Sequence, residues 1–556
     1  MEPKRQRISA EDAIASILQF VDDDDSGEDP EGKIAEAEQE EGEHEVEVEE
    51  EHGENDNTDD IVRTTRANRI AKVDRNRNNN IHYKFDNRPT NVNTGQNIQA
   101  NVIRGRQGVA PVAKGTKDNR KSFEHFITHD LVHKIVNYTN IKIEKVIAEL
   151  PDEFDNKKYP FIKPTVPSEL SAFGGLFLYR GLYKLNTISI DELFSNDYGP
   201  PIVSATMSRN RFTFLLSNLQ FDDQTTRDGR WKKDRFAAIR ELFEEFNHCC
   251  MLCLILDYLS LDETLYAMRT QIGFKQYNPN KPVKYGILFK SINAARDPYN
   301  FVAAPYSGRT IKEGGEYYVQ GTEEIVKYLI GRLKNMTELA GRNISFDRLY
   351  TSMSLSLWLY GKHITSIRTM QIIRKGIPPA IKCMQDRQPL SSEIYWQQDG
   401  RRCLSSYVVK TATTKKILLL STLPPLLGIT KDDNRNKLAQ STLYDFMKGG
   451  TDMIDRRMGF HRCKPKSRKW PIVVFSYIID KTRVNSATIH ALNQNKDPCK
   501  VNSYEYVFNL VMQFVKPFIE ECNVSPFQWQ IKNKIELILG RPQQPQHLEA
   551  VPSFDH

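Results

Sequence analysis

The spacing of hydrophobic residues changes character along the chain. Between about residues 123 and 259, apolar side chains recur at every third and fourth position, which predicts helices at Asp130–Tyr138, Leu170–Tyr183 and Phe236–Leu256. From Tyr258 onward, short apolar runs separated by turns predict β-strands instead. These runs cover 259–268, 284–294, 299–306 and 343–350. The pattern therefore predicts a helical segment followed by a mixed α/β core.

Helical spacing returns after the strand-rich stretch. The sequence predicts one more helix and strand, at Thr351–Tyr360 and His363–Ser366, and then a less regular region. Short strands are predicted in that region at 405–412 and 416–423. Further helices are predicted at Tyr444–Met458, Pro471–Asn493 and Tyr504–Phe518. The strand-rich core thus lies between helical flanks, and we detect no internal repeat.

The first 120 residues differ in composition from the rest. They are rich in charge, Asn and Gln and poor in aromatics, so they cannot bury enough apolar surface to offset the entropy of ordering. We therefore predict a disordered tail. Within it, residues 20–60 carry 21 acidic residues and one Lys, which leaves the remainder of the chain at a net charge of +26. Such a basic excess favours a polyanionic partner, of which nucleic acid is the commonest.

Targeting signals point to the nucleus. The polar, charged start predicts no secretory signal, and no apolar run reaches the roughly 18 residues of a membrane span. The eight Cys are expected to be reduced thiols in an intracellular protein. Basic clusters at Lys4–Arg7 and Arg63–Arg77 are explained either as nuclear import signals or as solvated residues of the tail, and the nucleus is the expected location.

Aspartates stand at the places where catalytic carboxylates would be expected. Asp262 lies in the apolar strand LSLDETLYAM, and Asp347 ends the apolar strand NISFD. A carboxylate in such a setting costs free energy unless a cation or hydrogen bonds compensate it. Asp452 and Asp455 lie three positions apart on a predicted helix, so both project from one face. The preceding Gly449–Gly450 would let the backbone approach a neighbour closely.

Carboxylates that converge from different elements suit two divalent metal ions. Mg²⁺ and Mn²⁺ prefer hard oxygen ligands. Two ions about 3.5–4 Å apart can activate a water or a 3′-hydroxyl and stabilise the leaving oxygen of a phosphodiester. Each aspartate taken alone is also explained as a helix cap or as a partner of Arg. Only the four together support the hypothesis of a metal site.

Several longer segments resemble the conserved blocks of the piggyBac transposase family. The first block is similar to LSLDETLYAM with the downstream segment PNKPVKYG and EYYV, and the second to FDRLYTSMSLSLWL. The third is similar to YDFMKGGTDMIDRRM followed by KSRKWP, and TMSRNRF matches a segment upstream of them. The similarity covers about residues 123 to 493. Several blocks in the family's order are much more specific than any single motif.

The resemblance implies a fold and a reaction. It implies an α/β fold with an RNase H-like catalytic core, a mixed sheet flanked by helices, inserted between helical DNA-binding and dimerisation segments. By matching position, Asp262, Asp347 and Asp452 are the implied catalytic residues and metal ligands, with Asp455 as the fourth. The implied activity is metal-dependent cleavage and strand transfer of double-stranded DNA by a homodimer, at TTAA sites and through a hairpin intermediate.

One departure from the family pattern leaves an alternative open. Family members often end in a Cys- and His-rich zinc-binding module that grips transposon ends, and this sequence has no such cluster after Cys522. A domesticated DNA-binding protein without mobility is therefore the main alternative. A carboxylate-based hydrolase of another polymer, such as a glycosidase, is a third possibility, against which the basic charge counts.

The expected domain organisation follows from these patterns and from the resemblance. We predict a tail at 1–120, the first part of a helical dimerisation and DNA-binding domain at 121–257, and the first part of the catalytic core at 258–370. An insertion is predicted at 371–438, the last core helix at 439–462, the second part of the helical domain at 463–540, and a C-terminal tail at 541–556.

The densest basic run of the predicted folded part follows the helix of Asp452. Lys and Arg neutralise phosphates, and a neighbouring aromatic can stack on an unpaired base. The alternative for the charges is a solvated helix face, and for Trp470 a place in the core. The predicted DNA contacts are Arg456, Arg457, Arg462, Lys464, Lys466, Arg468, Lys469, Trp470, Lys281 and Lys284, with His461, Arg209 and Arg211 as further candidates.

A CxxC motif with a neighbouring histidine is a candidate zinc site. His248, Cys249, Cys250 and Cys253 lie in an apolar helical pattern, and no second ligand pair has suitable spacing. A buried thiol behaves as a small apolar residue. We therefore predict that this segment is a buried helix.

Overall fold

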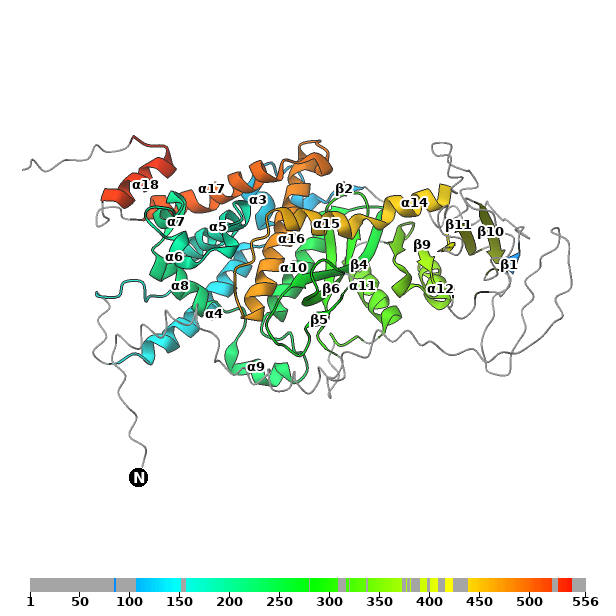
Figure 1. Ribbon diagram of the computed structural model, residues 1–556, viewed down its shortest axis with the longest axis horizontal. Helices are drawn as coiled ribbons and strands as arrows, with labels where there is room; N and C mark the ends of the chain where they lie inside the picture. Colours follow the sequence, from blue (N-terminus) through cyan, green and yellow to red (C-terminus); the bar gives the residue numbers. More distant parts are fainter. Residues whose placement is uncertain are drawn as a thin grey trace, which may run out of the picture.

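The computed structural model describes residues 85–86 and, with interruptions, 107–542. The interruptions fall at 152–156, 280, 309–316, 320, 337–338 and 523–528 and at several places between 373 and 438. Figure 1 shows an elongated molecule with helices at one end, a mixed sheet in the middle, and strands β10 and β11 at the other end. None of the described helices combines enough length with enough apolar character to cross a lipid bilayer.

Five strands form the centre of the sheet. They are β4 (Tyr258–Ala267), β6 (Tyr285–Ala294), β7 (Asn300–Pro305), β8 (Asn343–Phe346) and β9 (Thr365–Met370). They lie in the order β7-β6-β4-β8-β9, in which β7, β6 and β4 are antiparallel and β4, β8 and β9 are parallel. This is the strand order of an RNase H-like core. The predicted mixed sheet flanked by helices is confirmed.

The sheet continues beyond these five strands on both sides. Past β9 lie β12 (Lys416–Ser421), β11 (Cys403–Val408), β10 (Ser392–Gln397) and β1 (Phe85–Asp86), all antiparallel. Past β6 lies the short edge strand β5 (Gln276–Tyr277). The described strands of the region predicted as an insertion therefore extend the core sheet.

Helices precede, interrupt and follow the sheet. Several begin at a side chain that accepts a hydrogen bond from the first turn, among them Thr128, Ser208 and Asn502. The helices before the sheet are α3 (Asn119–Glu124), α4 (His129–Ala148), α5 (Pro167–Leu182), α6 (Ile190–Leu193), α7 (Pro201–Thr206), α8 (Arg209–Asn218), α9 (Gln224–Trp231) and α10 (Arg240–Cys253). The later ones are α11 (Thr322–Met336), α12 (Met353–Gly361), α14 (Ala439–Lys448), α15 (Gly450–Phe460), α16 (Trp470–Asn493), α17 (Ser503–Glu521) and α18 (Trp529–Leu539).

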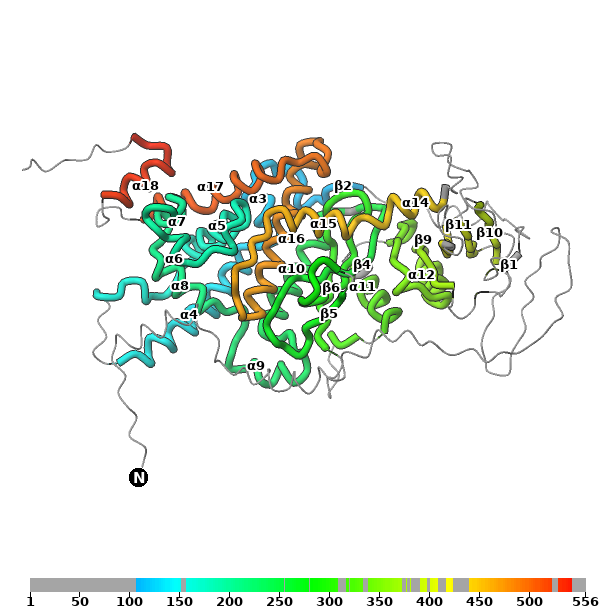
Figure 2. Tube along the Cα trace, viewed as in Figure 1, coloured from blue at the N-terminus to red at the C-terminus, as the bar shows by residue number. Residues whose placement is uncertain are grey.

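Helix α16 joins the helical end of the molecule to the sheet. It contacts α3, α10, α15 and α17, and its side chains are buried along most of its length. Figure 2 shows its path through the middle of the molecule. Tyr477 on α16 stacks on Phe289 of β6 with the ring centroids 3.9 Å apart. Segments from before and after the sheet therefore share one hydrophobic core.

Two predictions about boundaries are wrong. Residues 107–120, predicted to lie in the disordered tail, contain β2 (Gly108–Val109), which pairs with β3 (Leu254–Ile255). The Asn493 side chain also donates hydrogen bonds to the carbonyls of Ala113 and Thr116. These partners are distant in sequence, so composition did not reveal them. The single helix predicted at Tyr444–Met458 is two helices, α14 and α15, with the break at Gly449.

The cysteines behave as predicted. Cys249, Cys250 and Cys253 are buried in α10, and burial raises the pKa of each thiol. All cysteines in the described part of the chain are free.

Candidate functional site

Three of the predicted aspartates line one cavity of about 520 Å³. Asp262 comes from β4, Asp347 from the end of β8, and Asp452 from α15. Other residues of the cavity lining come from α14, β11 and β12, among them Tyr407 and Leu419. The parallel pairing of β4 with β8 brings the two strand aspartates to the same edge of the sheet.

Asp262 is the most deeply placed of the three. Its Oδ1 accepts a hydrogen bond of 2.7 Å from the backbone amide of Glu263. Burial, and to a smaller extent the negative charges of Glu263 and Asp347, raises the pKa of Asp262 to about 6. The hydrogen bond from the Glu263 amide and the charge of Lys281 oppose this shift. The positive charge of Lys281 therefore does not fully offset the burial of Asp262 and the neighbouring negative charges.

Asp347 lies exposed at the mouth of the cavity. It precedes the 3₁₀ turn Arg348–Tyr350 and accepts a 2.6 Å hydrogen bond from the amide of Arg348. Thr369 of β9 donates to the same carboxylate oxygen at 3.3 Å. The carboxylate is therefore oriented by two neighbouring elements, a turn and a strand.

Asp452 is positioned by the close approach of α15 to the sheet. A Cβ on Gly450 would lie 2.3 Å from the carbonyl oxygen of Ala294 in β6, so only Gly fits there. Asn293 of β6 donates a 2.7 Å hydrogen bond to Thr451, which fixes the first turn of the helix. The expected close backbone approach is confirmed at Gly450. At Gly449 an added Cβ would meet nothing within 4 Å.

The three carboxylates fit divalent cations in chemical kind. They offer hard oxygen atoms from three elements around one cavity, the ligands that Mg²⁺ and Mn²⁺ prefer. Across the residues that the structure describes, no three His, Cys, Asp or Glu side chains are grouped closely enough to hold a metal ion. Binding of ions would therefore require these carboxylates to move closer together.

Asp455 is placed differently from the other three. It does not line the cavity; its Oδ1 accepts a 2.8 Å hydrogen bond from Thr264 of β4. Burial raises its pKa, and the nearby charge of the buried Lys481 opposes that shift. This geometry does not favour the predicted role of Asp455 as a metal ligand. Its carboxylate accepts a hydrogen bond from β4 and lies near Lys481 of α16 instead.

Two predicted DNA contacts are wrong because the side chains are buried. Trp470 is 5% exposed and packs against Phe236 and Phe274, with ring centroids 5.3 and 5.2 Å away. Arg211 forms a buried ion pair with Glu169 at 2.6 Å and donates to nearby backbone carbonyls. Both are structural residues of the helical core.

The basic run after α15 contains both exposed and partly buried side chains. Arg456, Lys466 and Arg468 are exposed. Arg457 donates to the carbonyls of Cys499 and Val501. Arg462 lies over the Tyr266 ring, and Lys469 donates a hydrogen bond to the carbonyl of Ser217. Burial lowers the pKa of Lys464 to about 8 and also lowers the pKa of His461.

The β5–β6 hairpin carries a surface feature that the sequence reasoning missed. Tyr277 and Tyr285 form an exposed cross-strand pair with ring centroids 4.7 Å apart. Lys284 beside them is exposed, whereas Lys281 donates a hydrogen bond to the carbonyl of Glu263.

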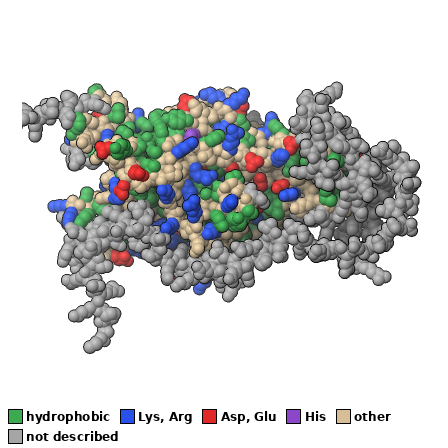
Figure 3. Space-filling view, in the orientation of Figure 1, with side chains coloured by type: hydrophobic (Ala, Val, Ile, Leu, Met, Phe, Trp, Pro, Cys, Tyr) green, Lys and Arg blue, Asp and Glu red, His purple; other side chains and the backbone are tan. Residues whose placement is uncertain are grey.

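Basic residues are also visible on the surface as a whole. On the face drawn in Figure 3, Lys and Arg side chains gather over the middle of the molecule. Arg209, a further candidate contact, forms an ion pair with Asp191.

Comparison with known proteins identifies relatives of the chain. The profile of the family described as Transposase IS4 matches residues 118–487. The human PiggyBac transposable element-derived protein 3 is 22% identical over 352 residues, which cover 59% of this chain and 56% of the relative. The human Chimeric ERCC6-PGBD3 protein is 22% identical over the same length, and the match covers 31% of it. The chain thus spans about half the length, or less, of these curated relatives.

A solved structure has the same fold. The cryo-EM structure of a piggyBac transposase synaptic complex with hairpin DNA superimposes with a TM-score of 0.69 at 24% sequence identity. The match covers 81% of this chain and 90% of the other. At this level of identity, the likeness shows the fold.

Proposed function

Since the chain belongs to the Transposase IS4 family, as a piggyBac-type member, we propose that it is a DNA transposase that cleaves and rejoins DNA strands with divalent metal ions. The observation that carries the proposal is the cavity shared by Asp262, Asp347 and Asp452. Three acidic side chains that are separated by 85 to 190 positions along the chain have no structural reason to face one cavity.

The residues of the site have separate tasks in this mechanism. Asp262, Asp347 and Asp452 would hold two Mg²⁺ or Mn²⁺ ions, which supply charge stabilisation for the attacking and leaving oxygens of a phosphodiester. The amide of Glu263 and the side chain of Thr369 orient two of these carboxylates. The attacking group is a water in the cleavage step and a 3′-hydroxyl in strand transfer.

Double-stranded DNA is the proposed partner. The solved structure with the same fold is described as a synaptic complex with hairpin DNA. In this chain, the exposed Arg456, Lys466 and Arg468 follow the helix that carries Asp452 and supply the positive charge that a phosphate backbone requires. TTAA target sites, a homodimer that holds two DNA ends together, and action in the nucleus belong to the same proposal.

A metal-dependent nicking assay on plasmid DNA tests the function. We expect the full chain to nick DNA with Mg²⁺ or Mn²⁺ and to stop when a chelator is added. Asp262→Asn, Asp347→Asn and Asp452→Asn should each lower the rate about 100-fold or more, because each removes several kcal/mol of transition-state stabilisation. Asp130→Asn, an exposed carboxylate on α4, is the matched control and should retain the rate.

Two outcomes would count against the proposal. Cleavage that continues after chelation would indicate a metal-independent hydrolase. DNA binding without cleavage, on any cognate end, would support a domesticated DNA-binding protein. The description of the human relative as a transposable element-derived protein favours this second candidate.

A further inference from the structure

Two tyrosines form an exposed aromatic pair on the β5–β6 hairpin. Tyr277 of β5 lies directly opposite Tyr285 of β6, and their ring centroids are 4.7 Å apart. Tyr277 is 54% exposed and Tyr285 is 49% exposed. Cross-strand aromatic pairs stabilise hairpins, which accounts for the contact between the rings. It does not account for their exposure, since two large rings that lie side by side in solvent are typical of a contact surface.

Lysines flank the pair. The Nζ of Lys275 lies 5.6 Å from the centroid of the Tyr285 ring, and the exposed Lys284 directly precedes Tyr285. Neither lysine forms an ion pair with another described residue. The surface thus combines aromatic faces with positive charge, the combination with which proteins bind unpaired nucleic acid.

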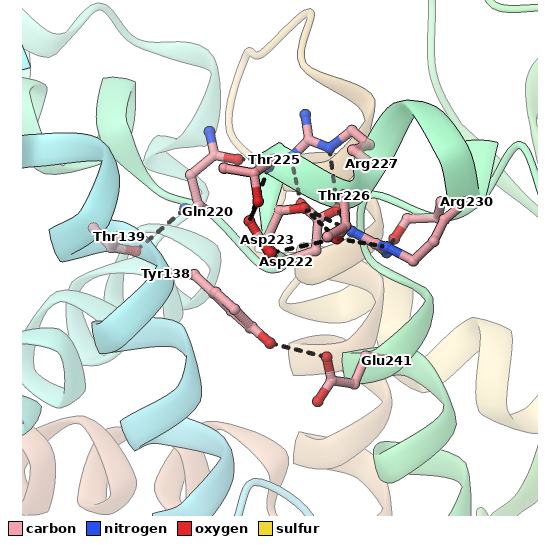
Figure 4. A network of polar contacts seen from close by, with 11 residues as sticks. Tyr138, Thr139, Gln220, Asp222, Asp223, Thr225, Thr226, Arg227, Arg230 and Glu241 are labelled. Carbon is pink, nitrogen blue, oxygen red and sulfur yellow. Dashed lines mark hydrogen bonds and ion pairs between the residues drawn. The ribbon is translucent and has the colours of Figure 1, made fainter. Parts of the chain in front are cut away.

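The arginines of helix α9 add no uncompensated charge to this surface. Asp222 is buried and pairs with both Arg227 and Arg230 (Figure 4). Arg230 also donates a 3.0 Å hydrogen bond to the carbonyl of Ala237, the residue after Phe236. These arginines therefore stabilise the core beneath the hairpin, and the charge available to a polyanion comes from the lysines.

The hairpin stands on a fixed base. Phe274, two residues before β5, packs against Phe236 and Trp470, with ring centroids 6.1 and 5.2 Å away. Thr270, between β4 and β5, donates a 2.8 Å hydrogen bond to the carbonyl of Arg468, so the hairpin adjoins the exposed part of the basic run. A surface that is held in place before binding loses little conformational entropy when a ligand arrives.

The tyrosines lie beside the catalytic cavity and do not line it. Gly286, next to Tyr285, pairs with Ala267, five residues beyond Asp262 on β4. A strand rises about 3.3 Å per residue, so roughly 20 Å separates the tyrosines from Asp262. Lys281, in the turn of the hairpin, spans part of that distance and donates to a backbone carbonyl of β4. At about 3.4 Å per nucleotide, a base held by the tyrosines lies about six nucleotides from the phosphate in the cavity.

We propose that Tyr277 and Tyr285 form a platform on which an unpaired base of DNA stacks, with the adjoining phosphates held by the flanking lysines. The choice of DNA as the partner rests on the proposed function. An unpaired base fits this surface better than a paired one, because the bases inside a duplex have both faces covered by their neighbours. The rings therefore add selectivity for DNA in which a base is unpaired, whereas the lysines contact phosphates of either form.

Binding of two matched duplexes by Tyr277→Ala tests the platform. The duplexes differ only in one unpaired base in the middle of one strand, and the affinity of the full chain for each is measured by fluorescence anisotropy, with chelator present to prevent cleavage. Loss of one stacking ring should weaken binding of the duplex with the unpaired base about fivefold to 100-fold and leave binding of the fully paired duplex within about twofold. Tyr198→Ala, which removes a tyrosine that is 91% exposed between α6 and α7, is the matched control and should keep the preference of the unmodified protein.

Tyr277→Phe separates stacking from a structural role of the residue. It keeps the ring, so it should bind both duplexes within about twofold of the unmodified protein. The fluorescent base 2-aminopurine, placed at the unpaired position, is quenched when it stacks on an aromatic ring. Its fluorescence should fall on binding to the unmodified protein and to Tyr277→Phe, and fall less on binding to Tyr277→Ala.

Three results would overturn the platform. The first is the absence of any preference for the unpaired base in the unmodified protein. The second is equal weakening of both duplexes by Tyr277→Ala together with a lower Tm, which would assign the ring to the stability of the hairpin. The third is a loss of affinity in Tyr277→Phe as large as that in Tyr277→Ala.

Failure of the platform and failure of the proposed reaction are distinguishable. If Tyr277→Ala loses the preference for the unpaired base although no cleavage is ever observed, the platform stands and the transposase reaction does not. If cleavage depends on Asp262 but Tyr277→Ala and Tyr198→Ala show equal preferences, the platform is overturned and the reaction stands.

Discussion

A histidine at the end of α15 illustrates how a single side chain ties stability to pH. His461 follows the helix that carries Asp452 and packs beside α5, where its backbone oxygen lies 2.6 Å from the Cβ position of Gly181. Burial, together with the nearby charge of Arg483, lowers the pKa of His461 to about 4. The imidazole is therefore neutral in the folded protein at pH 7.

Acidification should destabilise the protein through His461. In the unfolded chain the imidazole takes up a proton as the pH falls through about 6.5, whereas in the folded protein it does so only near pH 4. As the pH falls from about 6.5 to about 4, the folded protein should therefore lose stability relative to the unfolded chain. The loss is on the order of 1–2 kcal/mol after allowance for solvent screening. His461→Gln should flatten this part of the pH profile of urea unfolding midpoints.

An exposed histidine provides the comparison for that experiment. His133→Gln, on the solvent side of α4, should leave the profile between pH 6.5 and 4 as it is in the unmodified protein. Equal profiles for His461→Gln and His133→Gln would show that His461 does not contribute to acid sensitivity.

At the scale of elements, the docking of α15 on the sheet depends on one glycine. Gly450→Ala should destabilise the protein by about 2–3 kcal/mol, because the new methyl group would collide with the backbone of β6 rather than with a movable side chain. Gly449→Ala is the matched control. It has open space and should be neutral or stabilise by about 0.4–1 kcal/mol.

Thermal or urea unfolding of the two variants checks this prediction. Equal stabilities for Gly450→Ala and Gly449→Ala would mean that α15 can shift away from β6 without loss. A shifted helix would also displace Asp452, so the nicking rate of Gly450→Ala gives a second readout of the same contact.

The spacing of apolar residues predicted helices and strands well where one face of the element is apolar and the other is polar. The apolar spacing predicted α4, α5 and α10, and alternation predicted β4, β6, β7 and β8, with boundaries that differ by several residues at most in the strands. Helix α11 was missed because Gly and charged residues surround it in the sequence. The break between α14 and α15 was also missed, although Gly449–Gly450 lies at it.

The site was predictable in part, and the limit has a physical reason. Asp262 and Asp347 could be singled out because acidic residues in apolar strands are costly without a partner. Asp452 could be singled out because it lies on a predicted helix just after two glycines that allow close backbone approach. Trp470 and Arg211 could not be distinguished from surface residues, since their burial depends on Phe236, Phe274 and Glu169, which are distant in sequence. Pairing with distant residues is a tertiary property that local spacing does not encode.

At the scale of the whole molecule, the continuous sheet should make unfolding cooperative. β12 pairs with β9, and β11 and β10 follow, so the strands of the predicted insertion have no separate sheet. We expect hydrogen-exchange protection of β11 and β4 to be lost at the same urea concentration, because opening β11 exposes the edge of the core. Loss of protection in β11 well before β4 would indicate an independent unit.

The part of the cavity lining that comes from β11 and β12 has an evolutionary implication. Tyr407, Ile417 and Leu419 belong to the stretch that separates Asp347 from Asp452 in the chain, whereas the carboxylates lie on β4, at the end of β8 and on α15. Selection could therefore remodel the shape that a substrate meets without altering the acidic residues. Under the proposed function, exchange of residues 392–421 between relatives would change the shape of the cavity and leave the three carboxylates in place.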